Sequence, residues 1–284
     1  MSILQAIIMG IVQGLSEFLP ISSSAHLVIV SNIYKVLTGI ELAQESSQEI
    51  FLDIMLHLGT LIAVLIYFRK DILKILKAFF IALKTKDFSS KYAKLALYIL
   101  FGTITTVFIA FPLHSVAENL VFSPAIVGIL LIITGGILFF SEAYSKKLTE
   151  KCTDINLKTS ILMAIAQGLA ALPGFSRSGL TIATGLLSKR TRTAAAEYSF
   201  LLSIPIILGA SMLYPFIKID MTEFTQFNWS SIIWGTIVSA IVGYICIKYF
   251  LKFVGKYSLA FFGYYCIIIG IGTFVFFDMF AGKF

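Results

Sequence analysis

Charged residues are scarce in this chain of 284 residues. They make up 13% of the sequence, whereas 58% of the residues are hydrophobic and the mean hydropathy is +0.93. A water-soluble domain of this size has too little interior to bury so much apolar surface. The scarcity of charge therefore excludes a soluble protein and predicts an all-α polytopic membrane protein.

Clustered cysteines and a basic N-terminus are also lacking. The three cysteines, Cys152, Cys246 and Cys266, are scattered and odd in number, a pattern typical of neither a disulfide framework nor a metal site. No basic residue precedes the first apolar run, so we do not expect a removable signal peptide. The net charge of +7 is more typical of membrane orientation than of nucleic-acid binding, and no nucleic-acid partner is expected.

Long apolar stretches are abundant. A helix needs about 20 residues to cross a bilayer. Six stretches are long and clean enough: 50–68, 95–113, 124–141, 197–217, 231–250 and 258–279. Two more apolar regions, 3–37 and 159–187, are interrupted by polar residues. Because each of their arms is only ~10–14 residues long, we predict two re-entrant helix–loop–helix hairpins.

The distribution of basic residues favours these hairpins. If both broken regions return to their own side of the membrane, four loops share one face. Those loops carry all of the 22 lysines and arginines except Lys35, Arg177, Lys218 and Lys283. Cytoplasmic loops are enriched in such residues. We therefore expect both termini and the acidic segment 41–49 to lie outside the cytoplasm.

Each broken region contains the same sequence motif. The first has Gln-Gly-Leu at 13–15, Leu-Pro at 19–20 and serines at 22–24; the second has Gln-Gly-Leu at 167–169, Leu-Pro at 172–173 and serines at 176 and 178. Matched polar breaks in two halves indicate a binding site between inverted repeats. We predict one membrane domain made of two such repeats, about 1–145 and 155–284. Each repeat has a re-entrant hairpin followed by three transmembrane helices.

Three ionisable residues fall in the breaks, Glu17, His26 and Arg177. Such residues are costly at membrane depth and usually face a cavity with a partner. The serines precede apolar half-helices whose N-termini suit phosphate oxygens, as does the planar guanidinium of Arg177. The first break adds hydroxyl nucleophiles, a histidine that can move protons, and a carboxylate that can orient it or hold a divalent cation. The pattern predicts phosphoryl transfer to water from a phosphorylated lipid, with a phosphoserine as one route.

Other interpretations of the same residues stay open. The serines can be small packing residues, His26 can be structural, and Arg177 can extend to an interface. His57 and Asp53, four apart on one helix face, either line the cavity mouth or mark an interfacial turn. Broken helices in inverted repeats are also typical of transporters, so a carrier or flippase for a phosphorylated lipid is the alternative function.

The two breaks also resemble a known family. The segments 17–26 (Glu-Phe-Leu-Pro-Ile-Ser-Ser-Ser-Ala-His) and 173–179 (Pro-Gly-Phe-Ser-Arg-Ser-Gly) are similar to motifs of the undecaprenyl-diphosphatase (bacitracin-resistance) family, as are 56–60 and 196–205. The resemblance implies a hydrolase of the cytoplasmic membrane whose active site opens to the outer face. It implies release of one phosphate from undecaprenyl diphosphate, which yields the lipid carrier for cell-wall sugars. Bacitracin is expected to compete for this substrate, and a homodimer is one possible state.

The resemblance also implies roles for single residues. The family's motifs place Ser23 as nucleophile, His26 as general acid or base, Glu17 as an orienting group or cation ligand, and Arg177 as a phosphate clamp. Further candidates for substrate contact are Gln13, Ser22, Ser24, Gly174, Ser176, Ser178 and Thr181. Magnesium or calcium is the implied cofactor. Some members have a second glutamate at the position of Gln13, whose amide is a weaker cation ligand. The sequence does not choose among the serines at 22–24 as the reactive hydroxyl.

Overall fold

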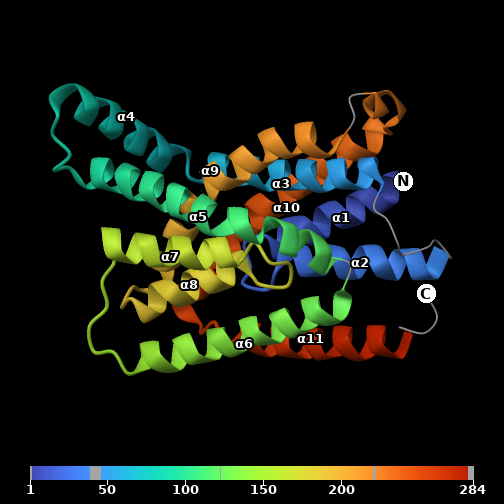
Figure 1. Cartoon of the computed structure of the whole chain (residues 1–284). Coiled ribbons are helices and arrows are strands. Elements are labelled where there is room, and N and C mark those ends of the chain that lie inside the picture. The colour runs from blue at the N-terminus through green and yellow to red at the C-terminus, as the bar shows by residue number, and fades with distance from the viewer. Residues whose placement is uncertain (1, 39–45, 122, 220–221, 281–284) are drawn as a thin grey trace.

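The computed structural model of the chain describes residues 2–38, 46–121, 123–219 and 222–280 (Figure 1). Within these ranges the chain forms eleven α-helices, one short 3-10 helix (η1, Glu223–Gln226) and no β-strand. The predicted all-α class is confirmed.

Two pairs of short helices lie inside the regions predicted as hairpins. Helices α1 (Ile3–Ser16) and α2 (Ser23–Thr38) flank the first break, residues 17–22, and α7 (Leu157–Leu169) and α8 (Arg177–Leu187) flank the second break, residues 170–176. Each break contains a proline, whose missing N–H costs no helical hydrogen bond there. The serine expected to cap the second half-helix does so, because Ser176 Oγ accepts a hydrogen bond from the N–H of Gly179 at 3.1 Å.

The long helices match the predicted spans. Five are long and apolar enough to cross a membrane: α3 (Ser47–Tyr67), α5 (Lys91–Val121), α6 (Pro124–Lys146), α9 (Arg192–Lys218) and α10 (Trp229–Lys256). The sixth predicted span is α11 (Ala260–Phe280), whose apolar stretch over Ala260–Phe276 is shorter. Length and composition thus indicate a multi-pass membrane protein.

One helix was not predicted. The basic segment after α3 was interpreted as a loop, but its first part is α4 (Arg69–Thr85), which packs against α5. Its lysines interrupt the apolar run and hide its helical character. Ile75 and Ala82 are nevertheless buried, seven residues apart on one face, as an amphipathic helix requires.

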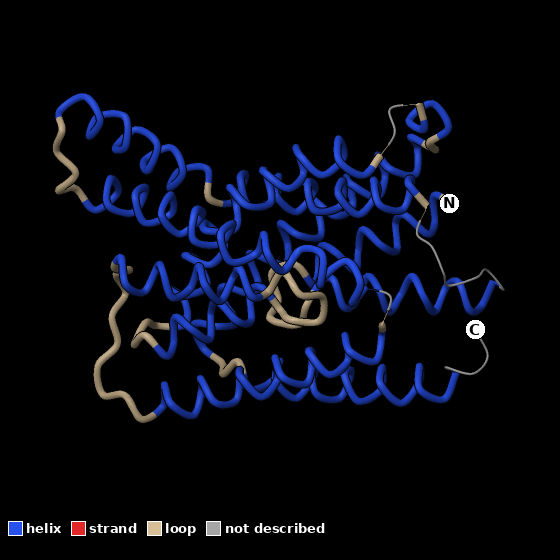
Figure 2. Tube along the Cα trace, viewed as in Figure 1, coloured by secondary structure: helices blue, strands red, loops and turns tan. Residues whose placement is uncertain are grey.

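The helices bring the two breaks together at the centre of the molecule. Helix α1 packs along α10, which packs along α3, while α7 packs along α5 and α6 along α11. The hairpins enter from opposite ends, and their breaks meet in the middle (Figures 1 and 2). Close approach of α1 to α10 depends on Gly10, because a Cβ atom there would lie 2.5 Å from the carbonyl oxygen of Gly235.

The basic segments gather at one end of the molecule. Helix α4 and the α6–α7, α8–α9 and α10–α11 connections all lie at the left of Figure 1, and α1 begins at the opposite end. At that opposite end Lys35 forms an ion pair with Glu49 at 3.5 Å. Residues 41–45 of the acidic segment lie outside the described residues.

Candidate active site

A cavity of about 800 Å³ borders both breaks. Its polar wall includes Glu17, Ser23 and Ser24 from the first hairpin and Ser176, Arg177 and Ser178 from the second. Helices α3, α5 and α9 supply further walls, much of them apolar, such as Leu56, Ala110 and Ile207. A polar head and an apolar tail of one ligand can therefore find complementary surfaces in the same cavity.

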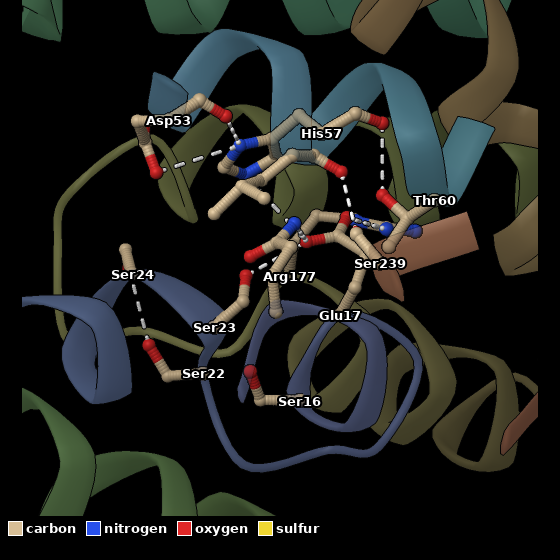
Figure 3. A network of polar contacts seen from close by, with 12 residues as sticks. Ser16, Glu17, Ser22, Ser23, Ser24, Asp53, His57, Thr60, Arg177 and Ser239 are labelled. Atoms are coloured by element: carbon tan, nitrogen blue, oxygen red, sulfur yellow. Dashed lines mark hydrogen bonds and ion pairs between the residues drawn. The ribbon is translucent and has the colours of Figure 1, made fainter. Parts of the chain in front are cut away.

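Glu17 connects the polar side chains of this wall through hydrogen bonds. It follows the last residue of α1 and is only 6% exposed. Its Oε1 accepts a hydrogen bond from Arg177 Nη2 at 2.5 Å, and its Oε2 accepts from Ser23 Oγ at 2.7 Å and from Gln13 Nε2 at 3.0 Å (Figure 3). The buried carboxylate is thus paired with a fixed positive charge and further hydrogen bonds, as burial of a charge requires.

A second contact joins the breaks. Ser178 Oγ donates to the carbonyl oxygen of Leu19 at 2.8 Å. Ser176, which caps α8, also donates through its backbone N–H to Thr134 Oγ1 of α6 at 3.3 Å. The N-terminus of α8 is therefore held beside the first break, with its positive dipole end at the cavity.

The three serines where the first break meets α2, Ser22, Ser23 and Ser24, are not equivalent. Ser23 bonds to the Glu17 carboxylate, whereas Ser22 Oγ lies 3.2 Å from Ser24 Oγ and accepts from the backbone N–H of Ala25 at 3.3 Å. Ser22 has a φ of +69°, so its backbone is in the left-handed region and turns the chain into α2. Only Ser23 therefore has a carboxylate in hydrogen-bonding contact among these three.

His26 faces away from the cavity. Its Nδ1 is 2.7 Å from the carbonyl oxygen of Ser22, which can only accept, so Nδ1 carries the hydrogen. Its Nε2 is 2.8 Å from the hydroxyl of Tyr265, and the two rings stack with centroids 5.6 Å apart. In the neutral ring both nitrogens are thus occupied, and His26 supports the turn at Ser22.

Four other candidates stand behind the cavity wall. Gln13 supports Glu17, and Ser22 forms the turn. Gly174, with a φ of +106°, packs against α6, where a Cβ would lie 2.6 Å from the carbonyl oxygen of Val127. Thr181 is buried within α8, its hydroxyl 2.6 Å from Ser199 Oγ. These residues position the site and do not line the cavity.

His57 and Asp53 of α3 belong to the site, which sequence reasoning left open. Both line the cavity, and His57 Nε2 is 3.6 Å from Glu17 Oε2. Their spacing of four residues on an apolar helix was the available signal. That spacing does not show that α3 packs beside the first break, so the contact with Glu17 could not be predicted.

In the part of the chain that the structure describes, no group of three or more His, Cys, Asp or Glu side chains is arranged so that it could hold a metal ion. Two oxygens of the kind that a hard cation prefers lie together at the cavity, Glu17 Oε2 and Ser23 Oγ, 2.7 Å apart. Substrate oxygens would have to complete such a set.

The fold and the site define a class of protein: a multi-pass helical membrane protein whose two broken hairpins share a buried ion pair. A model of the family described as "Bacitracin resistance protein BacA" matches residues 6–272. The chain therefore belongs to this family, as its motifs indicated.

Individual relatives agree with this assignment. The chain is 40% identical to the undecaprenyl-diphosphatase of Methanobrevibacter smithii, over 97% of this chain and 98% of that protein. It is 41% identical to the undecaprenyl-diphosphatase of Halothermothrix orenii, over 95% and 96% of the two chains. Undecaprenyl-diphosphatase 1 of Pseudoalteromonas translucida is 35% identical, over 97% and 99%.

Proposed function

We propose that this chain hydrolyses undecaprenyl diphosphate to undecaprenyl phosphate and inorganic phosphate. Membership of the bacitracin resistance family and relatives named for this activity support the reaction. The observation that carries the proposal is that Arg177 and Ser23 both donate hydrogen bonds to Glu17. A guanidinium that can bind phosphate, a carboxylate base and a hydroxyl nucleophile are thus in direct contact.

Each group has one role in the proposed reaction. Arg177 and the backbone N–H groups at the start of α8 bind the diphosphate. Ser23 Oγ attacks the terminal phosphorus while its proton passes to Glu17 Oε2. The bond from phosphorus to the bridging oxygen breaks, and undecaprenyl phosphate leaves with the electron pair. Water then attacks the phosphoserine, phosphate leaves, and Oγ regains a proton.

The general acid or base role predicted for His26 stays a prediction. Its ring is held by Ser22 and Tyr265, so the proposal assigns proton transfer from Ser23 to Glu17. His26 acts in this scheme by fixing the turn that presents Ser23.

A divalent cation, magnesium or calcium, is part of the proposal. Glu17 and Ser23 would hold it beside the diphosphate. Such an ion would neutralise charge on the phosphates. The single carboxylate predicts weak binding of the ion in the absence of substrate.

We also propose the predicted two-repeat organisation and orientation. When 1–145 is matched to 155–284, α1 corresponds to α7 and α5 to α10. The packing of α1 on α10 is then the counterpart of the packing of α7 on α5.

The basic segments gathered at one end of the molecule support the orientation. We infer that this end faces the cytoplasm, that the protein lies in the cytoplasmic membrane, and that the cavity is reached from the outer face. Bacitracin would then compete for the substrate there; a homodimer is compatible with this arrangement.

The test is phosphate release from a long-chain prenyl diphosphate by purified protein in detergent, with and without magnesium. Wild type should release phosphate, and Arg177→Ala should lose about 10²–10³-fold in rate. A folded wild type that binds the lipid but releases no phosphate would instead be a carrier or flippase, the alternative function.

A further inference from the structure

We propose that helix α4 is a binding surface for anionic phospholipids, with one side in the acyl region of the bilayer and a line of lysines on the lipid headgroups. The inference does not depend on the proposed hydrolysis, because none of the described residues that line the cavity belongs to α4. It rests on the position of α4 and on the way its residues are distributed around the helix axis.

Helix α4 lies at the edge of the molecule, at the basic end (Figure 1). It follows α3 after a single residue, Phe68, and packs against α5. Ile75 and Ala82 are buried on this side. Lys74 adds a contact there, because its Nζ lies 5.6 Å from the ring centroid of Tyr92 on α5. One side of α4 is thus used for packing on the rest of the chain.

A second side of α4 is apolar and exposed. We call it the apolar stripe; its side chains are 65%, 47%, 59% and 51% exposed in the order Leu73, Leu76, Phe80 and Leu83. Spacings of three and four residues place these side chains on one side of a helix. Helix α5, on which α4 packs, is apolar enough to cross a membrane. Lipid acyl chains beside α5 can therefore cover the apolar stripe as well.

A third side of α4 carries a line of exposed lysines. Lys70, Lys77 and Lys84, the lysine line, are seven residues apart and all exposed. Seven residues are almost two helical turns, so the three side chains leave the helix in nearly the same direction, about 10 Å apart along its axis. The line runs alongside the apolar stripe, about a quarter turn away. Asp71, the acidic residue of α4, lies 3.9 Å from Lys74 on another side.

This arrangement fits the boundary between acyl chains and headgroups. With the apolar stripe in the acyl region, the lysine stems extend along it and place their ammonium groups at headgroup level. Three positive charges there favour headgroups with a net negative charge, such as phosphatidylglycerol, over zwitterionic phosphatidylcholine. An acidic protein would match the lysine line, but the apolar stripe lies beside a membrane-crossing helix, where lipid is the neighbour.

The experiment measures which lipids contact α4 in vesicles. Phe80→Trp places a fluorophore on the apolar stripe, and Trp229→Phe with Trp234→Phe removes the two native tryptophans. The full chain is reconstituted in phosphatidylcholine vesicles that contain brominated phosphatidylglycerol or, separately, brominated phosphatidylcholine. Bromine quenches tryptophan fluorescence on contact. The relative quenching at equal fractions of brominated lipid gives the lipid preference at α4.

Two triple variants are compared in this background. The first replaces the lysine line: Lys70→Gln/Lys77→Gln/Lys84→Gln. The matched control removes the same charge from three exposed lysines at the same end, where α6 meets the α6–α7 connection: Lys146→Gln/Lys147→Gln/Lys151→Gln. Thermal unfolding in detergent checks that each variant is folded.

We expect α4 to prefer phosphatidylglycerol at low salt. A lysine near the membrane surface contributes about fivefold, so three allow a preference of up to about 10²-fold. Replacement of the lysine line should lower the preference by about tenfold or more. The control variant should keep it. In the protein with its lysines intact, about 1 M salt should weaken the preference, because the charges are then screened.

Several results would overturn the inference. Equal quenching by the two lipids does so, as does quenching by neither, which would mean that a protein covers the apolar stripe. An equal loss in the control variant would assign the preference to the whole basic end. Inorganic phosphate that abolishes the preference, where chloride of equal ionic strength does not, would assign the lysine line to a soluble anion. If the lysine-line variant does not fold, a preference unaffected by salt overturns the inference.

Discussion

Arg177 Nη2 lies 2.5 Å from Glu17 Oε1, and this ion pair joins the start of α8 to the first break, although the two residues are 160 positions apart in the chain. The second nitrogen of the guanidinium, Nη1, is buried and has no hydrogen-bond partner within the described parts of the chain. One side of the arginine thus holds the carboxylate, and Nη1 remains a donor without a partner, which we expect to bind phosphate oxygens in the proposed reaction.

Breaking this pair should be costly for stability. Arg177→Gln leaves the Glu17 carboxylate buried without its partner, and we expect a loss of about 3–5 kcal/mol in the free energy of unfolding. The double variant Glu17→Gln/Arg177→Gln removes both charges and should lose less than the sum of the single variants. Denaturant unfolding in detergent of the wild type, both single variants and the double variant measures the coupling energy between the two side chains. Strictly additive losses would show that the two side chains are not coupled.

Ser23→Ala should lower phosphate release by about 10³-fold or more while lipid binding remains, because it removes the proposed nucleophile. The matched control is Ser141→Ala on α6, a buried serine whose hydroxyl donates to the carbonyl oxygen of Leu138 at 2.9 Å. It should keep a wild-type rate. Turnover retained by Ser23→Ala would transfer the nucleophilic role to His26 or to a water molecule.

Tyr265→Phe should distinguish a structural His26 from a catalytic one. The change removes the hydroxyl at Nε2, and we expect a loss of about 1 kcal/mol in unfolding free energy with only a small drop in rate. His26→Gln should show a similar modest effect if the ring only supports the turn at Ser22. A His26→Gln protein of normal stability and no activity would restore the general acid or base role.

Gly174→Ala should destabilise the second break. Gly174 has a φ of +106°, and the added Cβ would lie 2.6 Å from the carbonyl oxygen of Val127, so the break must move from α6. We expect a loss of more than about 1 kcal/mol and weaker phosphate release, read from thermal unfolding and turnover. Gly136→Ala on α6 is the control, because its Cβ would meet nothing within 4 Å. It should be neutral or stabilising.

Cys152 offers a test of orientation without engineering. It is exposed on the α6–α7 connection at the basic end, whereas Cys246 and Cys266 are buried. A membrane-impermeant thiol reagent should label it only after intact cells or spheroplasts are permeabilised. A cysteine introduced at Ser46, an exposed residue just before α3 near the opposite end, should be labelled without permeabilisation. The reverse pattern would invert the proposed topology.

Much of the fold followed from local properties of the chain. Apolar length predicted the long helices, and the short arms around residues 17–26 and 173–178 predicted the two breaks, because a bilayer imposes a minimum span. Helix α4 was missed because its lysines interrupt the apolar run that served as the signal. As a sequence signal for a helix, the amphipathic spacing of a segment that packs on one side only is weaker than a continuous apolar stretch.

The sequence named candidate residues, and the structure shows how they lie. Glu17, Ser23 and Arg177 contact one another at the cavity, and the roles predicted for them stay predictions. His26 is turned to Tyr265, and His57 stands beside Glu17 instead. Nothing in a spacing along the chain tells which of two histidines faces a carboxylate on another helix.

By itself, the sequence determined that this is a helical membrane protein with two polar breaks and a set of groups suited to phosphate chemistry. Burial of apolar length and the cost of charge at membrane depth depend mainly on residue type and order. Only the tertiary structure decided which side chains contact the same carboxylate oxygen of Glu17. That choice depends on how α1, α3 and α8 pack, and packing is set by contacts between residues far apart in the chain.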